Sequence, residues 1–119
     1  MLNSDFYKGK RILITGHTGF KGTWMCQVLL ELGADVTGYA LQPPTNPSLF
    51  ELMCMEGKLR SVEGDVRDLQ HLQETFEQVQ PEIVIHMAAQ PIVRESYKNP
   101  VYTYDVNVMG TVNVMECVR

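Results

Sequence analysis

Three glycines spaced three residues apart follow a short apolar run near the start of this 119-residue chain. The apolar run is Ile12-Leu13-Ile14, and the glycines are Gly16, Gly19 and Gly22. A short apolar run that ends at glycine is typical of a fully buried strand. Because residues with helical spacing begin directly after the glycines, the pattern predicts a strand, a tight turn and a helix in immediate succession.

Strand-like and helix-like segments alternate along the rest of the chain. We expect strands at 12–14, 36–41, 59–62 and 83–85, and helical segments at 20–32, 49–55 and 69–79. Each predicted strand is apolar throughout, which indicates parallel strands covered by helices on both faces. The sequence therefore predicts a single α/β domain that forms the N-terminal portion of a Rossmann-type, doubly wound parallel sheet.

The last segment, from residue 99 onward, allows two interpretations. Val106 and Val108 alternate as they would in a strand, and β-branched residues favour strands. Asn99-Pro100, however, is a helix-opening pair, with Asn as the cap and Pro in the first turn. We predict a helix, and because its apolar residues exceed one stripe we expect it to face a second copy in a homo-oligomer.

Composition narrows the classes of protein to consider. The chain is 45 % apolar and 20 % charged, which fits a globular core. Its formal charge of −4 argues against nucleic acid as a partner, and no apolar run is long enough for a membrane span. The polar start lacks a signal peptide, and the three cysteines have no metal-ligand spacing. We expect a cytoplasmic protein without a metal site.

The glycine-rich turn suits a diphosphate. A dinucleotide needs a tight turn, a backbone that it can approach, and a helix N-terminus with free N–H groups. The spacing here is Gly-x-x-Gly-x-x-Gly, which by itself is also compatible with an ordinary glycine-rich turn. Since a strand precedes it and an amphipathic helix follows it, we predict a dinucleotide site.

Acidic residues near the strand ends refine this prediction. Asp35 stands before the second strand, whereas a ribose-binding acid belongs at the carboxyl end of that strand, so we reject Asp35 as a ligand. No arginine follows that strand to meet a 2′-phosphate, which favours NAD over NADP. Asp65, after the third strand, could accept a hydrogen bond from an adenine amino group, or it could serve only its own turn.

The segment after the fourth strand contains small residues. Ala88 and Ala89 would let a cofactor pass close to the backbone. We interpret His86, which precedes them, as a histidine satisfied inside the fold rather than a catalyst, and Cys26 as a packing residue.

Four motifs, in this order, resemble those of the extended short-chain dehydrogenase/reductases. They are Thr15-Gly16-x-x-Gly19-Phe20-x-Gly22, Gly64-Asp65-Val66, His86-x-Ala88-Ala89 and Asn107-Val108-x-Gly110-Thr111. The amino-acid sequence at residues 16–22, 38–41, 43–50 and 88–91 is similar to that of the CDP-glucose 4,6-dehydratases within this family. General NAD binding would not dictate the Pro-Pro-Thr-Asn-Pro-Ser-Leu-Phe stretch at 43–50.

This resemblance implies a set of site residues. The turn and Asp65-Val66 would hold the diphosphate and the adenine, the segment after the fourth strand would line the nicotinamide, and Ser96 would contact the substrate. Asn107 and Thr111 would support the cofactor and the loop after the fourth strand. The implied cofactor-binding residues are Gly16, Thr18, Gly19, Phe20, Lys21, Gly22, Asp65, Val66, Ala88, Ala89, Gln90, Asn107 and Thr111.

The family's reaction also follows from the resemblance. An NAD-dependent dehydratase of this kind removes water from a nucleotide sugar, which implies a role in deoxysugar and lipopolysaccharide biosynthesis. Its Tyr-x-x-x-Lys pair is absent here, because none of the five tyrosines is followed four residues later by lysine. We therefore expect an N-terminal part without catalytic residues, inactive alone.

Three alternatives remain open at this point. The first is another nucleotide-sugar epimerase or dehydratase. The second is a non-catalytic module that senses NAD(H) or NADP(H), which the missing Tyr-x-x-x-Lys pair would suit. The third is a structural interaction fragment, in which the glycine-rich turn would have no purpose.

Overall fold

The computed structural model describes residues 5–43, 46–53, 55 and 57–119. Its strands are β1 (Arg11–Thr15), β2 (Asp35–Ala40), β3 (Arg60–Glu63) and β4 (Ile83–His86). Its α-helices are α1 (Phe20–Glu31), α2 (Leu49–Leu52), α3 (Leu69–Val79), α4 (Val93–Lys98), α5 (Pro100–Tyr104) and α6 (Gly110–Val118). A π-helical segment, η1 (Asp105–Met109), joins α5 to α6.

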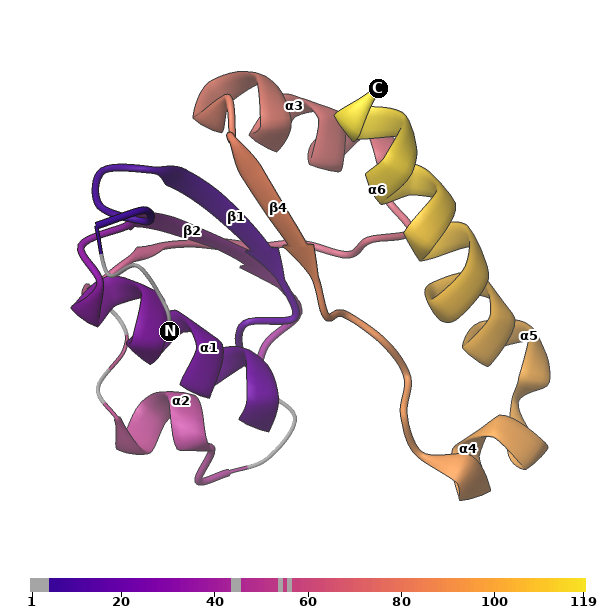
Figure 1. Cartoon of the computed structure of the whole chain (residues 1–119). Helices are drawn as coiled ribbons and strands as arrows, with labels where there is room; N and C mark the ends of the chain where they lie inside the picture. The colour runs from indigo at the N-terminus through magenta and orange to yellow at the C-terminus, as the bar shows by residue number, and fades with distance from the viewer. Residues whose placement is uncertain (1–4, 44–45, 54, 56) are drawn as a thin grey trace.

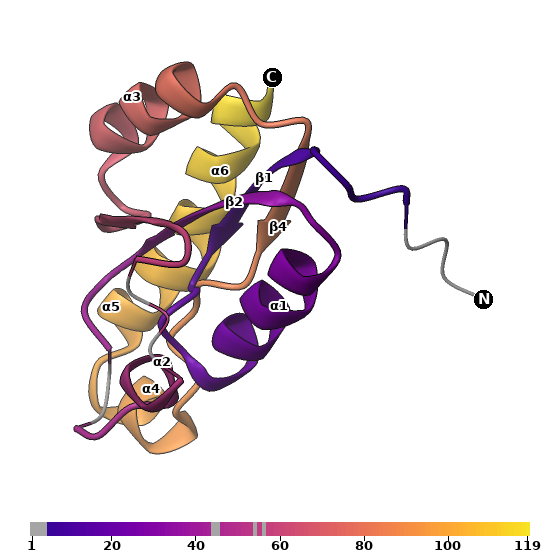
Figure 2. The same cartoon turned by 90° about the vertical axis from the view of Figure 1, so that its left-hand side faces the viewer.

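The four strands form one parallel sheet in the order β3-β2-β1-β4, which confirms the predicted Rossmann-type architecture. Helices α1 and α2 lie on one face of the sheet, and α3 and α6 lie on the other (Figures 1 and 2). Two buried clusters fill the two interfaces. Ile12 and Ile14 pack in the first cluster with residues of α1, and Leu13 packs in the second with residues of α3. Burial on both faces explains why the inner strands β1 and β2 are mostly apolar. The prediction that every strand is apolar throughout is wrong for β3, whose residues Arg-Ser-Val-Glu lie at an edge of the sheet and are mostly exposed.

Helix α1 buries a different face from the one that its large apolar residues suggest. Trp24 and Val28, two of the large apolar residues at helical spacing in this segment, are 48 % and 47 % exposed. Its buried residues are Gly22, Thr23, Cys26 and Leu29. The reason lies in the first turn, where Thr23 Oγ1 donates a hydrogen bond to the carbonyl of His17 and so fixes the rotation of the helix. Cys26 is fully buried, as its assignment to packing requires.

The ends of α1 and α5 follow local sequence signals. Gly33 has a φ of +83° directly after the C-cap of α1, a conformation that glycine adopts without steric cost. Asn99 caps α5 by accepting a hydrogen bond from the backbone N–H of Tyr102, with Pro100 in the first turn. The last segment is therefore helical, as predicted, and the strand interpretation is wrong. It runs as one continuous arm from α5 through η1 to α6 (Figure 1).

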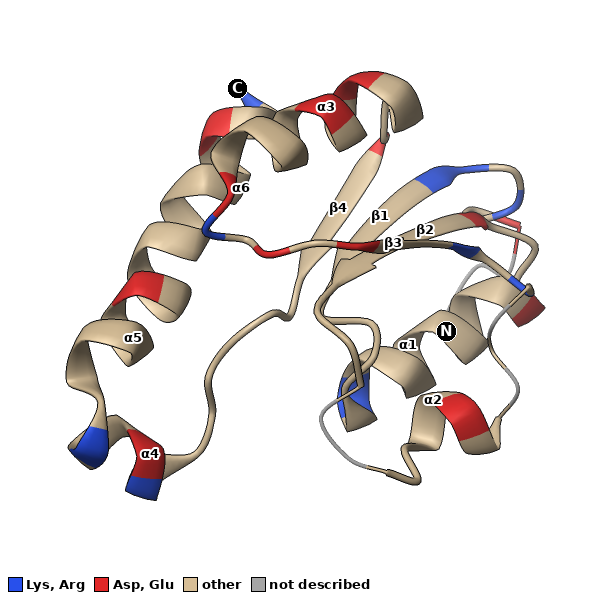
Figure 3. Cartoon of the chain, turned by 180° about the vertical axis from the view of Figure 1, so that it is seen from behind, with Lys and Arg blue, Asp and Glu red and all other residues tan. Residues whose placement is uncertain are grey.

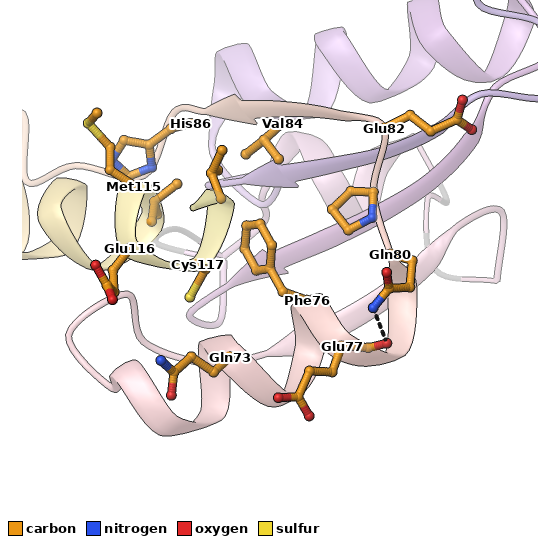
Figure 4. A pocket seen from close by; sticks show the side chains of 13 residues that line it. Gln73, Phe76, Glu77, Gln80, Glu82, Val84, His86, Met115, Glu116 and Cys117 are labelled. Carbon is orange, nitrogen blue, oxygen red and sulfur yellow. Dashed lines mark hydrogen bonds between the residues drawn. The ribbon is translucent and has the colours of Figure 1, made fainter.

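One of the two edges of the sheet lies along β4, and the other lies along β3. Among the described residues β4 pairs with β1 alone. A hollow of about 740 Å³ opens beside β4, between α3 and α6, with Phe76, Val84 and Val114 among its lining residues (Figure 4). In the part of the chain that is described, no helix combines the length and the hydropathy that a membrane crossing requires.

Candidate functional site

The glycine-rich turn lies at the carboxyl edge of the sheet, between β1 and α1. Gly16 has a φ of +79°, and a Cβ built on it would stand 2.7 Å from the backbone nitrogen of Ala88. A Cβ on Gly22 would stand 2.1 Å from the carbonyl oxygen of Gly16. Both positions therefore require glycine, because the turn is pressed between the exit of β4 and the first turn of α1.

The N-terminus of α1 is left open for a ligand. Gly19 is the N-cap, so no side chain caps this helix, and its first turn contains no acidic residue. The nearest atom to a Cβ built on Gly19 is the carbonyl oxygen of Gly16, at 3.5 Å. Uncapped N–H groups and the positive end of the helix dipole favour an anion at this point. Phe20 and Lys21, which the family resemblance implies as cofactor-binding residues, supply the first two of these N–H groups.

Thr15 joins the ends of β1 and β4. Its Oγ1 accepts hydrogen bonds from the backbone N–H groups of Met87 (3.0 Å) and Ala88 (3.1 Å). It therefore donates its own proton to Nδ1 of His86, 2.6 Å away. The Nε2–H of His86 then donates to Oγ1 of Thr111 at 3.1 Å. Burial lowers the pKa of His86, which keeps the ring neutral, and both ring nitrogens are satisfied as predicted.

Asn107 holds the segment that follows β4. Its Oδ1 accepts a hydrogen bond from the backbone N–H of Gln90 (2.7 Å), and its Nδ2 donates to the carbonyl of Gln90 (3.1 Å). The Nε2 of Gln90 donates in turn to Oγ1 of Thr103 at 3.0 Å. Asn107 lies in η1, and π-helical turns are frequent at functional sites. The long helical arm therefore fixes the loop predicted to line the nicotinamide.

Asp65 and Val66 follow the exit of β3. The carboxylate of Asp65 binds the guanidinium of Arg67, with a shortest N–O distance of 2.6 Å, and hydrogen bonding to Arg67 lowers the pKa of Asp65. The carbonyl of Val66 accepts a hydrogen bond of 2.9 Å from Nδ2 of Asn113, on α6. Gly110 lies so close that a Cβ on it would stand 2.6 Å from Cγ2 of Val66.

His17 lies under the turn, and the sequence analysis did not single it out. Its ring is 1 % exposed, and its Nε2 lies 2.7 Å from Oγ of Ser61 on β3. The Nδ1 atom has no hydrogen-bond partner among the described atoms. A Cβ on Gly38 would stand 2.2 Å from the ring. Glycine inside a buried strand indicates that another group packs closely against the backbone. Gly38 was therefore the residue in the sequence that could have indicated the position of the His17 ring.

The exit of β2 offers no ribose-binding acid. Tyr39 is fully buried, and its hydroxyl donates to the carbonyl of Asp65 at 2.8 Å. Asp35 begins β2 at the opposite end of the strand, in register with Arg11, which agrees with its rejection as a ligand. Thr18, in the turn, reaches the end of β2 through a hydrogen bond from its Oγ1 to the carbonyl of Leu41. Pro44, Thr45 and Cys54 lie outside the described residues.

Ser96 is the predicted site residue that stands apart. The segment after β4 was expected to be a loop, but Ser96 lies in helix α4, far from the glycine-rich turn (Figure 1). Its Oγ donates to the carbonyl of Val93 at 2.5 Å, the contact of a hydroxyl with its own helix. The remaining predicted residues lie at or beside the carboxyl ends of β1, β3 and β4, where ligands bind in open parallel sheets.

The large hollow beside β4 is not part of this site. It runs along β4 from Pro81 and Glu82 at the amino end to His86 at the carboxyl end, and none of the glycines of the turn lines it. No group of three or more His, Cys, Asp or Glu residues in the described part of the chain could hold a metal ion.

Comparisons with known proteins agree with this geometry. A sequence model of the family described as GDP-mannose 4,6 dehydratase matches residues 13–119. The chain is 51 % identical over 119 residues to CDP-glucose 4,6-dehydratase of Salmonella typhimurium (strain LT2), covering all of this chain and 33 % of that relative. It is 32 % identical over 116 residues to GDP-mannose 4,6-dehydratase of Yersinia enterocolitica, covering 92 % of this chain and 31 % of that relative.

Solved structures share the fold. The epimerase Mth375 of Methanothermobacter thermautotrophicus has a TM-score of 0.83 at 28 % identity, over 97 % of this chain and 33 % of that one. UDP-glucose 4-epimerase of Brucella ovis, solved in complex with NAD, has a TM-score of 0.76 at 30 % identity, over 92 % of this chain and 32 % of that one. The chain thus spans about a third of the length of these relatives.

Burial makes His17 a testable feature of the site. It lowers the pKa of His17 to about 4, so between roughly pH 4 and 6.5 the unfolded chain binds a proton at this residue that the folded chain does not. The His17 contribution to the free energy of unfolding is therefore present above the unfolded pKa and is lost as the pH falls toward 4, by up to about 3 kcal/mol.

NMR of the histidine rings, assigned with a His17→Gln variant, measures this pKa directly. We expect the His17 ring protons to keep their chemical shifts from pH 8 to 5 and to move only near pH 4. A titration midpoint near 6.5 would contradict the buried position of the ring.

Proposed function

The chain belongs to the GDP-mannose 4,6-dehydratase family, and from this premise we propose that it is the dinucleotide-binding part of an NAD-dependent nucleotide-sugar dehydratase. The observation that carries the proposal is the uncapped N-terminus of α1 behind a turn in which Gly16 and Gly22 leave no room for a Cβ. A cradle of this form fits a diphosphate.

The residues present suit the three parts of the cofactor. The diphosphate would lie on the amides of Phe20 and Lys21, and the adenine beside Asp65. Ala88 and Ala89 have short side chains, so that the nicotinamide would lie close to a backbone held by Thr15. When bound, NAD would supply an acceptor for hydride from C4 of the sugar and, in its reduced form, the hydride for C6 after loss of water across C5 and C6.

The exit of β2 supports NAD rather than NADP. A 2′-phosphate on the adenosine ribose calls for a cation at that position. The sequence has no Lys or Arg between Tyr39 and Lys58, so it offers no such partner after β2.

We propose CDP-glucose as the sugar nucleotide, because the whole chain aligns at 51 % identity with a CDP-glucose 4,6-dehydratase. A second candidate is epimerisation of another nucleotide sugar, which the 30 % identity to a UDP-glucose 4-epimerase favours. Ser96 remains a proposal for substrate contact. The free cysteines Cys26 and Cys117 suit the reducing cytoplasm that we propose as the setting.

The catalytic and sugar-binding parts lie outside these 119 residues in this proposal. None of the tyrosines precedes a lysine by four residues. The Tyr-x-x-x-Lys pair that abstracts the sugar hydroxyl proton would therefore come from a part of the protein outside these 119 residues. The free edge of β4, with the hollow beside it, is the place where a further parallel strand would pair with the sheet (Figure 4).

We further propose that the helical arm at 100–118 associates with a second copy of itself. Its inner face, including Val106 and Val114, packs inside the fold, while seven large apolar residues are 47–79 % exposed. These are Val101, Tyr104, Val108, Met109, Val112, Met115 and Val118. Asp105 and Glu116 are the only charged residues in this range, and Figure 3 shows an arm that is mostly uncharged.

The size and place of this surface favour a second copy as its occupant. Met115 and Val118 line the hollow beside β4, and the other five side chains expose on the order of 500 Å², most of the roughly 800 Å² that each partner buries in a standard interface. An apolar groove of about 550 Å³, lined by Val101, Tyr104 and Val108 among others, lies on the same face. A two-fold contact would bury this surface on both copies at once.

Gly19 tests the cofactor site. In a protein that carries this chain together with its catalytic part, Gly19→Val places a branched side chain in the open space at the N-terminus of α1. We expect the affinity for NAD, measured by calorimetry, to fall about tenfold or more, while the free energy of unfolding changes by about 1 kcal/mol. Gly9→Asn, in a turn with free space around it, is the matched control and should bind NAD normally. Unchanged NAD affinity in the Gly19 variant would contradict the proposal.

Substrate trials separate the candidate reactions. Supplied with CDP-, dTDP- and GDP-hexoses, the longer protein should release water from CDP-glucose with the highest kcat/KM, detected by mass spectrometry. The 119-residue chain alone should give no product, because it lacks the catalytic pair. Turnover by the chain alone, or epimerisation without loss of water, would refute this part of the proposal.

Charge insertion tests the self-association. Val108→Glu and Val112→Glu should each convert dimers of the longer protein into monomers, measured by sedimentation velocity. The reason is that each substitution places a carboxylate on both copies, so that two like charges meet across the two-fold contact. Leu52→Glu, at a residue 68 % exposed on α2, should leave the dimer intact. A wild-type monomer, or dimers that persist in both arm variants, would overturn the arm as the interface.

A further inference from the structure

Arg67 fixes the carboxylate of Asp65 through a compact set of contacts. Oδ1 of Asp65 accepts hydrogen bonds from the Arg67 backbone N–H (2.9 Å) and from Nε (3.1 Å). Oδ2 accepts from Nε (3.0 Å) and from Nη2 (2.6 Å). Three N–H donors make these four contacts, because the Nε–H is shared between the two oxygens, and each oxygen accepts two of the contacts. The carboxylate is thus held in one orientation.

The guanidinium is itself held by the helical arm. Its Cζ lies 4.9 Å from the centre of the Tyr102 ring, on α5, and Nη1 lies 3.7 Å from Oδ2 of Asp105, at the start of η1. A planar fork can bind one carboxylate side-on while its face lies over an aromatic ring, which the rounder charge of a lysine cannot reproduce. The arm therefore sets where Arg67 points, and Arg67 sets where Asp65 points.

The backbone of this loop is fixed without the Arg67 side chain. The carbonyl of Asp65 accepts hydrogen bonds from the hydroxyl of Tyr39 (2.8 Å) and from the backbone N–H of Asp68 (2.9 Å). The carbonyl of Val66 is held by Asn113. Removal of the guanidinium should therefore leave the path of the loop intact and leave the Asp65 carboxylate with one of its hydrogen bonds, that from the backbone N–H of residue 67.

We propose that Arg67 is a positioning residue for adenine recognition, which rests on the function proposed above. By holding the Asp65 carboxylate in one orientation, Arg67 presents an acceptor to the 6-amino group of adenine. The carbonyl oxygen at that position in hypoxanthine offers no proton and meets the same carboxylate as a repelled acceptor. Arg67 is therefore a determinant of the preference for adenine over hypoxanthine.

The test compares NAD with nicotinamide hypoxanthine dinucleotide, which differs at this position of the purine. Calorimetry on the longer protein measures the dissociation constants of both for the wild type, Arg67→Met and Arg67→Lys. We expect the wild type to prefer NAD by about tenfold or more. Arg67→Met should raise the dissociation constant of NAD about fivefold and that of the hypoxanthine analogue less than about twofold. The preference for NAD over the analogue should therefore narrow, and Arg67→Lys should give an intermediate preference.

A control variant and the ratio of the two dissociation constants distinguish failure of the proposed Arg67 role from failure of the proposed cofactor site. Arg60→Met, at an exposed arginine that begins β3, should keep the wild-type preference. If Arg67→Met weakens both dinucleotides equally, or neither, while the wild type still prefers NAD, the role of Arg67 is overturned and the cofactor site stands. If the wild type binds neither dinucleotide, the proposed function fails and the role of Arg67 fails with it.

Discussion

The close approach of three backbone segments at the carboxyl edge of the sheet is the constraint on which the rest of this structure depends. Gly22 lies against the carbonyl of Gly16, and Gly16 lies against the backbone of Ala88, so that a Cβ at either glycine would overlap its neighbour. This contact brings the start of α1 and the exit of β4 together around one open, uncapped helix N-terminus. The buried face of α1 begins at Gly22 and Thr23, whereas Trp24 is half exposed.

The helical arm from α5 to α6 extends this arrangement over the whole edge. Asn107 holds the loop after β4, Thr111 continues the hydrogen-bond chain that begins at Thr15, and Asn113 holds the loop after β3. One element thus supports both ends of the proposed cofactor site. Because the outer face of the same arm is apolar and exposed, the dimer that we propose would place the two cofactor sites on elements that touch the interface.

Much of this fold follows from local sequence pattern. Apolar runs marked the strands because both faces of a parallel sheet are buried, and Asn99-Pro100 marked the start of the arm because capping is a local interaction. The contacts of His17 and Arg67 did not follow, since each depends on segments that meet only in the folded chain. His17 reaches Ser61 across the sheet, and Arg67 meets Tyr102 on a helix thirty-five positions further along. Ser96 was placed by analogy with a loop, and the structure has a short helix there.

Amide chemical shifts in the presence of NAD provide the most direct measurement of the central claim, that a diphosphate lies on the N-terminus of α1. If the account is right, the largest changes on titration fall on the backbone N–H groups of Gly19, Phe20, Lys21 and Gly22, with a second group at Asp65 and Val66. ADP should reproduce both groups of changes. Shifts confined to the hollow between α3, β4 and α6, with the turn unaffected, would contradict it.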